Sequence, residues 1–398
     1  MSFINGNTLQ NIFPNKELSN FYITVAIGAF GDRLMSIFVP IYLYQMGYPI
    51  YQILFFYFIS FLFFIIFAHA AMRLILKIGP KHSILYSAPL IIVYYLGLLA
   101  IPDFPFLFYV LPICLAGRML FYNYGYHLHI IPHLDSKHEG GELSFINALI
   151  LISSLLAPVL GGILAQYHFS ILYVVGSVIL LLSNIPLFLT KDTATHHCER
   201  IKLGNTINQI TSKKWRGAAL SFAGYGAEVV IGATIWPIYL IVVLGNIEKT
   251  GFIVSLSLVF SLVVFYAMGK ITDTYNKRKI LHIGSLLYFL GWVGRIFATN
   301  TLLILAVDSY KNMSEKILHI PWIAKCYDLA KQKDYPAFLV FQHFVYNSTR
   351  TLIIPVLIVI FYLDFYPFIL SFIIAAIGSL GYSQINRTAN QIKKANRH

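Results

Sequence analysis

Two stretches half a chain apart share the same four-residue core: FVPIYLYQMG at residues 38–47 and IWPIYLIVVLG at residues 235–245. Pro-Ile-Tyr-Leu occupies residues 40–43 and 237–240, an offset of 197 residues. A second match at the same offset pairs APVL at 157–160 with IPVL at 354–357. Two matches at one offset predict a chain of two related halves, with prolines at equivalent depths in equivalent helices.

The composition excludes an ordinary soluble domain. Hydrophobic residues make up 58% of the 398 residues and charged residues only 11%, whereas a soluble domain carries about 25% charge. Apolar stretches long enough to cross the roughly 30 Å hydrocarbon core recur from Phe21 to Tyr382. The three cysteines lie far apart and predict no disulfide framework. The polar segment 1–20 lacks the pattern of a cleavable signal peptide.

The apolar pattern predicts twelve membrane spans. Each must be helical, because lipid offers no partner for backbone N–H and C=O groups. The tenth is the least regular, since it carries several charged residues. The predicted spans are 21–44, 50–72, 83–101, 106–130, 143–166, 169–190, 217–244, 250–270, 280–298, 301–323, 337–362 and 365–384.

The basic residues orient these spans. Of the 29 Lys and Arg residues, 22 lie at the termini and in the loops on one side, while the opposite loops hold Lys249 alone. The positive-inside rule therefore predicts that both termini are cytoplasmic, and it explains the net charge of +13 without a nucleic-acid partner. We expect an N-terminal bundle at 1–190, a weakly structured linker at 191–216, a C-terminal bundle at 217–384 and a basic tail at 385–398 that contacts lipid headgroups.

Three motifs resemble the major facilitator superfamily of transporters. GKITDTYNKRK at 269–279 is similar to its cytoplasmic signature, and MRLILKIGPKH at 72–82 is a degenerate counterpart with Leu76 in place of the acid. SSLLAPVLGG at 153–162 resembles a span-5 signature of the antiporter branch. The matching residues are Gly269, Asp273, Lys277, Arg278, Lys77, Gly79, Lys81, Pro158, Gly161 and Gly162.

This resemblance implies an all-α integral membrane protein with twelve transmembrane helices in two pseudo-symmetric six-helix bundles. It also implies that spans 1, 4, 7 and 10 line a central cavity, and that Lys77, Gly79, Lys81, Gly269, Asp273 and Arg278 take part in gating. For Pro158, Gly161 and Gly162, a coupling role and plain close packing of small residues both remain open.

Charged residues inside the spans are candidates for the cavity, because a buried charge costs about 2.5–3.5 kcal/mol on insertion scales. Asp32, Arg118 and Glu228 fall about 16–18 Å into their spans, near the midplane. Asp308, Lys311, Glu315 and His319 share one face of the tenth span. The predicted cavity residues are Asp32, Arg33, Arg118, Glu228, Asp308, Lys311 and Glu315, with Tyr122 and Trp236 as aromatic contacts; Arg295 and Arg350 fall outside this set.

Two interpretations of the central charges remain. In the first, Asp32 or Glu228 carries a coupling proton and Arg118 is its charge partner. In the second, Asp32 and Arg118 form a permanent ion pair that only orients two helices.

The sequence thus predicts a secondary transporter of a small organic solute that works by alternating access and uses a proton gradient or another coupling ion. The span-5 motif slightly favours export, whereas the mixed cavity charges also permit symport of an anionic or zwitterionic solute. We expect a monomer in the bacterial inner membrane, with no cofactor, metal or nucleic acid, and no enzyme activity. The alternatives are a transporter-like sensor without transport, or a lipid-modifying enzyme built on His127, His133, Asp135 and His138.

Overall fold

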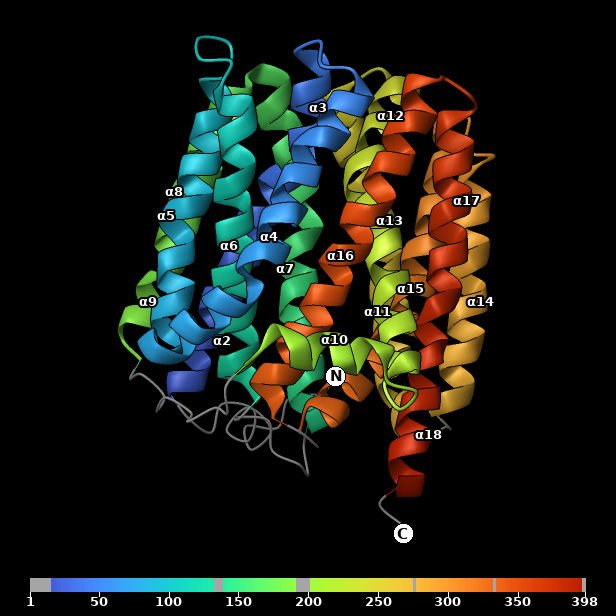
Figure 1. The fold of residues 1–398 in the computed structure, drawn as a ribbon. Coiled ribbons are helices and arrows are strands. Elements are labelled where there is room, and N and C mark those ends of the chain that lie inside the picture. The colour runs from blue at the N-terminus through green and yellow to red at the C-terminus, as the bar shows by residue number, and fades with distance from the viewer. Residues whose placement is uncertain (1–15, 132–138, 191–200, 275–276, 332–333, 396–398) are drawn as a thin grey trace, which may run out of the picture.

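The computed structural model describes residues 16–131, 139–190, 201–274, 277–331 and 334–395, without the side chains of 16–19, 139–149, 151, 153–154, 263, 265–274, 277 and 393–395. Its regular elements are all helical and run side by side, as Figure 1 shows. Spans 1–6 are α2 (Lys16–Ser36) with α3 (Phe38–Gln45), α4 (Ile50–Ile78), α5 (Pro80–Leu99), α6 (Leu107–Ile130), α7 (Glu139–Tyr167), and α8 (Phe169–Ser183) with α9 (Ile185–Phe188).

The second half repeats this series. Its elements are α11 (Arg216–Val230) with η2 (Ile231–Ile235) and α12 (Trp236–Leu244), α13 (Ile247–Thr274), α14 (Lys277–Arg295), α15 (Thr301–Lys331), α16 (Tyr335–Tyr362), and α17 (Pro367–Leu380) with η3 (Gly381–Gln384) and α18 (Ile385–Ala395). The described part of the chain therefore contains all twelve predicted spans. Eight helical stretches in it are long and apolar enough to cross a membrane. The protein is an integral membrane protein.

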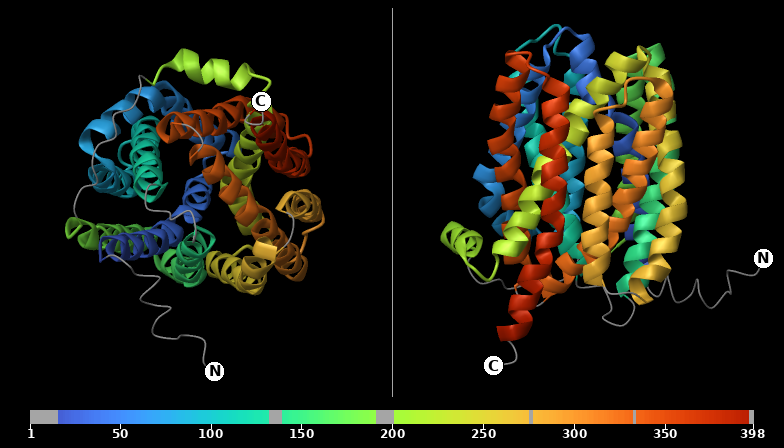
Figure 2. Two further views of the ribbon diagram at one scale, coloured as in Figure 1. Left: turned by 90° about the horizontal axis from the view of Figure 1, so that it is seen from below. Right: turned by 90° about the vertical axis from the view of Figure 1, so that its right-hand side faces the viewer.

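The two halves meet along two long helix pairs, α7 with α13 and α4 with α16. The ring of helices is visible in the end-on view of Figure 2. On the first seam, a Cβ added at Gly251 would lie 2.2 Å from the carbonyl oxygen of Pro158, and one at Gly162 would lie 3.0 Å from that of Ile247. Small residues thus allow the backbones to approach closely at this seam. Gly161 serves a similar purpose toward α2, since its added Cβ would lie 2.3 Å from the carbonyl oxygen of Leu34.

The repeated Pro-Ile-Tyr-Leu segments follow helix irregularities at corresponding positions of the two halves. In span 1 the helix is interrupted at Ile37 before Pro40, and in span 7 it widens into the π-helical segment η2 before Pro237. Proline explains both, because it lacks the N–H that would bond to the carbonyl four residues earlier.

The tyrosines of the two segments occupy equivalent environments. The Tyr42 hydroxyl donates to the carbonyl oxygen of Leu98 at 3.4 Å, and the Tyr239 hydroxyl donates to that of Ala298 at 3.1 Å. Each therefore ties its span to the end of the third helix of its half. Their rings pack in the same way on the sixth helix of each half, with Phe169 and Tyr173 around Tyr42 and Phe368 and Phe372 around Tyr239.

The linker between the halves contains a helix, contrary to our expectation of weak structure throughout. Residues 191–200 lie outside the description, but α10 (Leu203–Thr211) runs along the outside of the bundle near the terminal face, the end of the bundle where α2 begins and α18 ends (Figures 1 and 2). One side of α10 is anchored, since Thr206 Oγ1 lies 3.0 Å from His69 Nε2 of α4. Leu203 and Ile207 are exposed. Exposed apolar residues one turn apart on such a helix are suited to contact with a membrane surface.

We predict that Gly251→Ala lowers stability by about 1–3 kcal/mol, the usual cost of overpacking a tight contact. The matched control is Gly204→Ala in α10, because no atom lies within 4 Å of its added Cβ. Thermal unfolding of the two purified variants in detergent measures the difference. Equal unfolding temperatures would contradict the assignment of Gly251 to the close seam.

Candidate substrate cavity

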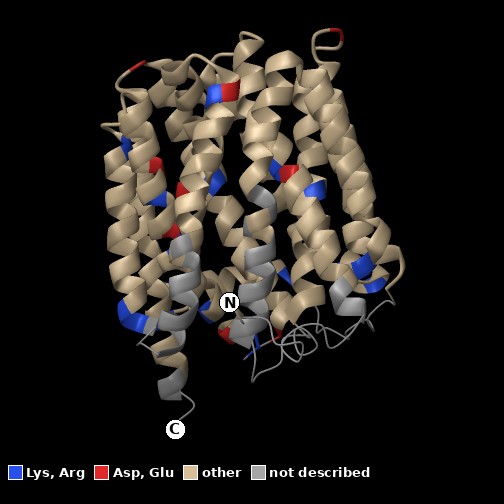
Figure 3. Ribbon diagram, turned by 180° about the vertical axis from the view of Figure 1, so that it is seen from behind, with Lys and Arg blue, Asp and Glu red and all other residues tan. Residues whose placement is uncertain are grey.

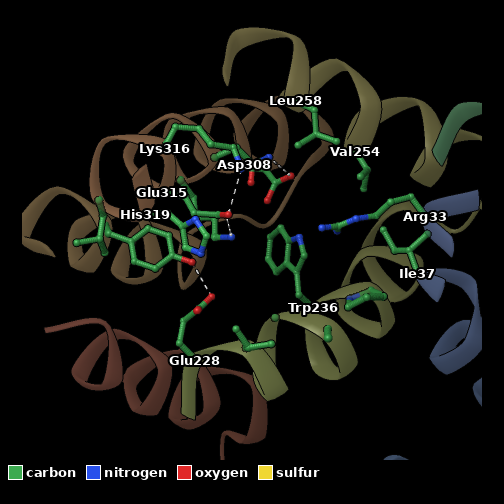
Figure 4. Close-up of a pocket in the computed structure, with 18 of the residues that line it drawn as sticks. Arg33, Ile37, Glu228, Trp236, Val254, Leu258, Asp308, Glu315, Lys316 and His319 are labelled. Atoms are coloured by element: carbon green, nitrogen blue, oxygen red, sulfur yellow. Dashed lines mark hydrogen bonds and ion pairs between the residues drawn. The ribbon is translucent and has the colours of Figure 1, made fainter. Parts of the chain in front are cut away.

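A cavity of about 470 Å³ lies between the halves, mostly against the second half. Figure 4 shows the side chains that surround it. Its walls come from α2, α7, the three segments of span 7, α13, α14, α15 and η3. A volume of this size is typical of sites for small organic ligands.

The polar face predicted for the tenth span lines the cavity. Asp308, Lys311, Glu315 and His319 all contribute to the wall, as does Lys316. Lys311 Nζ lies 2.7 Å from Glu315 Oε2, and Lys316 Nζ lies 3.3 Å from Glu315 Oε1. One carboxylate therefore serves two ammonium groups. Figure 3 shows acidic and basic residues at the middle depth of the bundle, separate from the basic residues near the terminal face.

The ion-pair partner of Asp308 is a residue that we expected outside the cavity. Arg295 of α14 forms an ion pair with Asp308, and both side chains are almost completely buried. Ser257 Oγ also donates to Asp308 Oδ2 at 2.8 Å, and Asn312 Nδ2 donates to Ser257 Oγ at 2.9 Å. Arg295 was expected outside the cavity but lines it. The sequence already contained an indication of this pairing, because an arginine buried in a membrane span requires an acid within reach.

Aromatic rings enclose the Arg295 guanidinium on two sides. Its Cζ lies 3.8 Å from the ring centre of Trp236 and 4.4 Å from that of Trp292. Cation–π contacts of this kind stabilise a desolvated guanidinium without using its N–H donors. Arg295 Nε and Nη1 accordingly remain buried without a hydrogen-bond acceptor among the described residues.

Glu228 lies at the end of α11, directly before the π-helical segment, and is 4% exposed. It accepts hydrogen bonds from Tyr288 Oη at 2.5 Å and Tyr382 Oη at 3.0 Å. The charges of Lys311, Glu315 and Arg350 act on it. No ion pair to Glu228 occurs among the described residues, so its charge depends on hydroxyl donors and on the field of charges on α15 and α16.

The structure separates Asp32 and Arg118 from this cavity. Arg118 Nη2 lies 3.0 Å from Asp32 Oδ1, and its Cζ lies 4.6 Å from the ring centre of Tyr122. None of these three residues is part of the cavity wall, although we expected them there. The physical reason is helix geometry: successive residues point about 100° apart. Asp32 faces α6, whereas Arg33 enters the cavity.

Arg33 and Trp236 approach each other across the boundary between the halves. Figure 4 shows the Arg33 side chain extending from α2 toward the Trp236 ring. Arg33 is exposed, and no carboxylate pairs with it among the described residues. Trp236 is 4% exposed, and its Nε1 has no hydrogen-bond acceptor in the described structure.

Contacts between the halves flank the cavity on both sides. Toward the face opposite the termini, α3 packs against α12 in an apolar layer that includes Phe38, Val39 and Ile238. Toward the terminal face, His127 Nδ1 of α6 lies 3.0 Å from Tyr327 Oη of α15. The His127 ring also packs against His343 of α16. Spans 1 and 7 thus meet on one side, and spans 4 and 10 on the other.

The motif residues are described unevenly. Pro158 lines the cavity, and Gly161 and Gly162 pack closely as described above. Lys81 Nζ donates to the carbonyl oxygen of Thr190 at 2.5 Å, Lys77 is exposed and Gly79 links α4 to α5. Arg278 is exposed at the start of α14. The side chains of Asp273 and Lys277 lie outside the described residues, and for Gly269 only its place in α13 is described.

The histidine cluster considered for an enzyme lies mainly outside the description, because residues 132–138 include His133, Asp135 and His138. His127 is described and takes part in the contact between the halves. Within the part of the chain that is described, no group of three or more His, Cys, Asp or Glu side chains could hold a metal ion.

No protein-family model matches the chain, and no curated protein sequence does. Several solved structures, however, have a similar fold. A variant of the E. coli fucose:proton symporter FucP has a TM-score of 0.64 and 14% sequence identity, over 94% of this chain and 99% of that chain. A second structure, of FucP in the outward conformation, is described as a major facilitator superfamily transporter. It has a TM-score of 0.62 and 14% sequence identity, over 94% of this chain and 98% of that chain. The chain therefore has the major facilitator fold, which confirms the predicted fold class. Neither match singles out the antiporter branch.

We predict that Asp308→Asn destabilises the protein by about 3–5 kcal/mol, because it leaves Arg295 buried without its counter-ion. The double variant Arg295→Gln/Asp308→Asn removes both charges, so it should unfold at a higher temperature than the single variant. Thermal unfolding of both variants in detergent provides the comparison. Additive losses in the double variant would show that the two groups do not depend on each other.

Proposed function

We propose that the protein is a secondary transporter that moves a small organic solute together with a coupling proton by alternating access. The observation that carries this proposal is the charged cavity between the halves, flanked by the α3–α12 layer on one side and by the His127–Tyr327 contact on the other. Opening one contact while the other stays closed would expose the cavity to one side of the membrane at a time. The fold similarity to FucP, described as a fucose:proton symporter, supports this mechanism.

Glu228 is our candidate for the proton-binding group. It faces the cavity, it is buried, and it lacks an ion-pair partner among the described residues. Two tyrosine hydroxyls hold it in place in either protonation state, since a hydroxyl can donate to the carboxylate or accept from the acid. Asp32 is the second candidate, but its pairing with Arg118 favours the role of orienting α2 against α6.

The remaining expectations also stay proposals. The distribution of basic residues supports cytoplasmic termini, and we propose a monomer in a bacterial inner membrane. The export direction loses its motif-based support, because Gly161 and Gly162 act in helix packing and FucP is described as a symporter. The enzyme alternative loses one of its residues to the contact between the halves, where His127 lies against Tyr327.

We predict that Glu228→Gln abolishes solute-driven proton uptake while solute exchange continues, because glutamine keeps the shape and cannot release a proton. A thermal-shift screen of metabolites identifies a solute, and a pH-sensitive dye inside proteoliposomes then reports proton uptake. Glu248→Gln is the control, since Glu248 is exposed at the start of α13 and outside the cavity wall. If Glu228→Gln leaves proton uptake unchanged, Asp32→Asn is the next test; unchanged uptake in both would exclude coupling through either acid.

A further inference from the structure

We infer that the transported solute is an organic anion whose carboxylate binds between Arg33, Trp236 and Arg295. This inference rests on the proposed function and names its substrate class. It starts from a concentration of hydrogen-bond donors: Arg33 enters the cavity without a carboxylate partner, and Trp236 Nε1 and Arg295 Nε and Nη1 are buried without acceptors among the described residues. Indole and guanidinium nitrogens only donate, so these three side chains cannot satisfy one another.

The three side chains are close neighbours. The Arg295 Cζ lies 3.8 Å from the ring centre of Trp236, and Figure 4 shows Arg33 extending toward the same ring from the other half. Two guanidinium groups that approach the same indole carry like charge and repel each other. A carboxylate between them would remove the repulsion and accept from all three donors. Arginine is well suited to this, because its fork can bind a carboxylate with two parallel hydrogen bonds.

The charges of the cavity wall point to the same class of ligand. Among the described residues of the wall, four are cationic (Arg33, Arg295, Lys311 and Lys316) and three are acidic (Glu228, Asp308 and Glu315). Arg295 pairs with Asp308, and both lysines share Glu315. With all three acids ionised the wall keeps one surplus positive charge, and Arg33, which the first half supplies, is its cation without a carboxylate partner among the described residues.

The rest of the solute would be apolar or aromatic. The wall next to Arg33 includes Ile37, Val254 and Leu258, and the Trp236 ring adds a flat surface. These side chains offer few partners for the hydroxyl groups of a sugar. This part of the cavity thus suits the apolar portion of an amphipathic carboxylate.

The same charges couple the anion to the proton. Protonation of Glu228 removes one negative charge from the wall, so an anion binds more tightly to the protonated form, and by linkage the anion favours protonation. The groups around Glu228 are Tyr288 of α14, Tyr382 of η3, Tyr225 of α11, Lys311 and Glu315 of α15, and Arg350 of α16. His319 of α15 also lines the cavity and adds a second titrating group. Anion and proton would therefore travel in the same direction.

The binding test uses purified protein in detergent, without any gradient. The probes are benzoate and indole-3-acetate, their neutral amides, glycerol 3-phosphate and L-fucose, each followed by thermal shift and calorimetry. We expect the carboxylates to stabilise the protein and the amides and fucose to have little effect. Arg33→Gln should weaken carboxylate binding about 10- to 100-fold, the loss of a charged hydrogen-bonding group. Arg73→Gln is the control, because Arg73 is exposed on α4 outside the cavity wall.

The inference fails if no carboxylate binds, if carboxylate and amide bind equally, or if Arg33→Gln binds as wild type does. Tighter binding of glycerol 3-phosphate than of either carboxylate would also overturn it, in favour of a phosphate ester. The proposed transport function is tested separately from the anion site. Carboxylate binding without flux in proteoliposomes would refute the transport function and leave the inferred anion site intact. Flux of a neutral solute without carboxylate binding would support the transport function and refute the anion site.

The linkage has its own readout. At a pH where the carboxylate stays ionised, binding to the wild type should strengthen as the pH falls. Glu228→Gln should bind tightly throughout and lose most of that dependence, and His319→Gln separates the part that histidine contributes. A pH dependence that survives unchanged in Glu228→Gln would contradict coupling through this acid.

Discussion

Charge inside a lipid bilayer must find either a counter-charge or water, and α15 carries four charged side chains into the membrane region. This constraint accounts for much of the architecture around it. Asp308 forms an ion pair with Arg295 of α14, and Glu315 forms ion pairs with Lys311 and Lys316 on its own helix. The remaining side of the helix faces a cavity. The hollow between the halves is therefore a condition for the stability of α15 as well as the place where we propose that a solute binds.

The halves play unequal parts in this site. The second half contributes most of the wall and a network that is nearly balanced in charge, whereas the first half contributes Arg33 from the last turn of α2. A ligand held by Arg33 and by Trp236 would contact both halves at once. Such a ligand could stabilise the closed arrangement, which is the differential affinity that a conformational cycle requires.

The pseudo-symmetry of the two halves extends beyond the repeated Pro-Ile-Tyr-Leu sequence. Tyr42 and Tyr239 make the same type of hydrogen bond to the third helix of their halves, and the prolines before them accompany helix irregularities of different kinds. Spans 1 and 7 close one side of the cavity and spans 4 and 10 the other. Each contact joins a helix to its own repeat, so that a rocking motion about the α4–α16 and α7–α13 seams would exchange one contact for the other.

Periodicity and composition were enough to predict the twelve helices, the proline-marked repeat and the polar face of α15, because these depend on local hydropathy and on the 3.6-residue turn. Tertiary structure alone decided which neighbour each charge meets. Asp32 and Arg33 are adjacent in the chain, yet one pairs with Arg118 and the other enters the cavity, and Arg295 finds Asp308 across a helix interface. Hydropathy sets how deep a residue lies, but the rotation of each helix against its partners sets where its side chain points, and that depends on packing across the whole bundle.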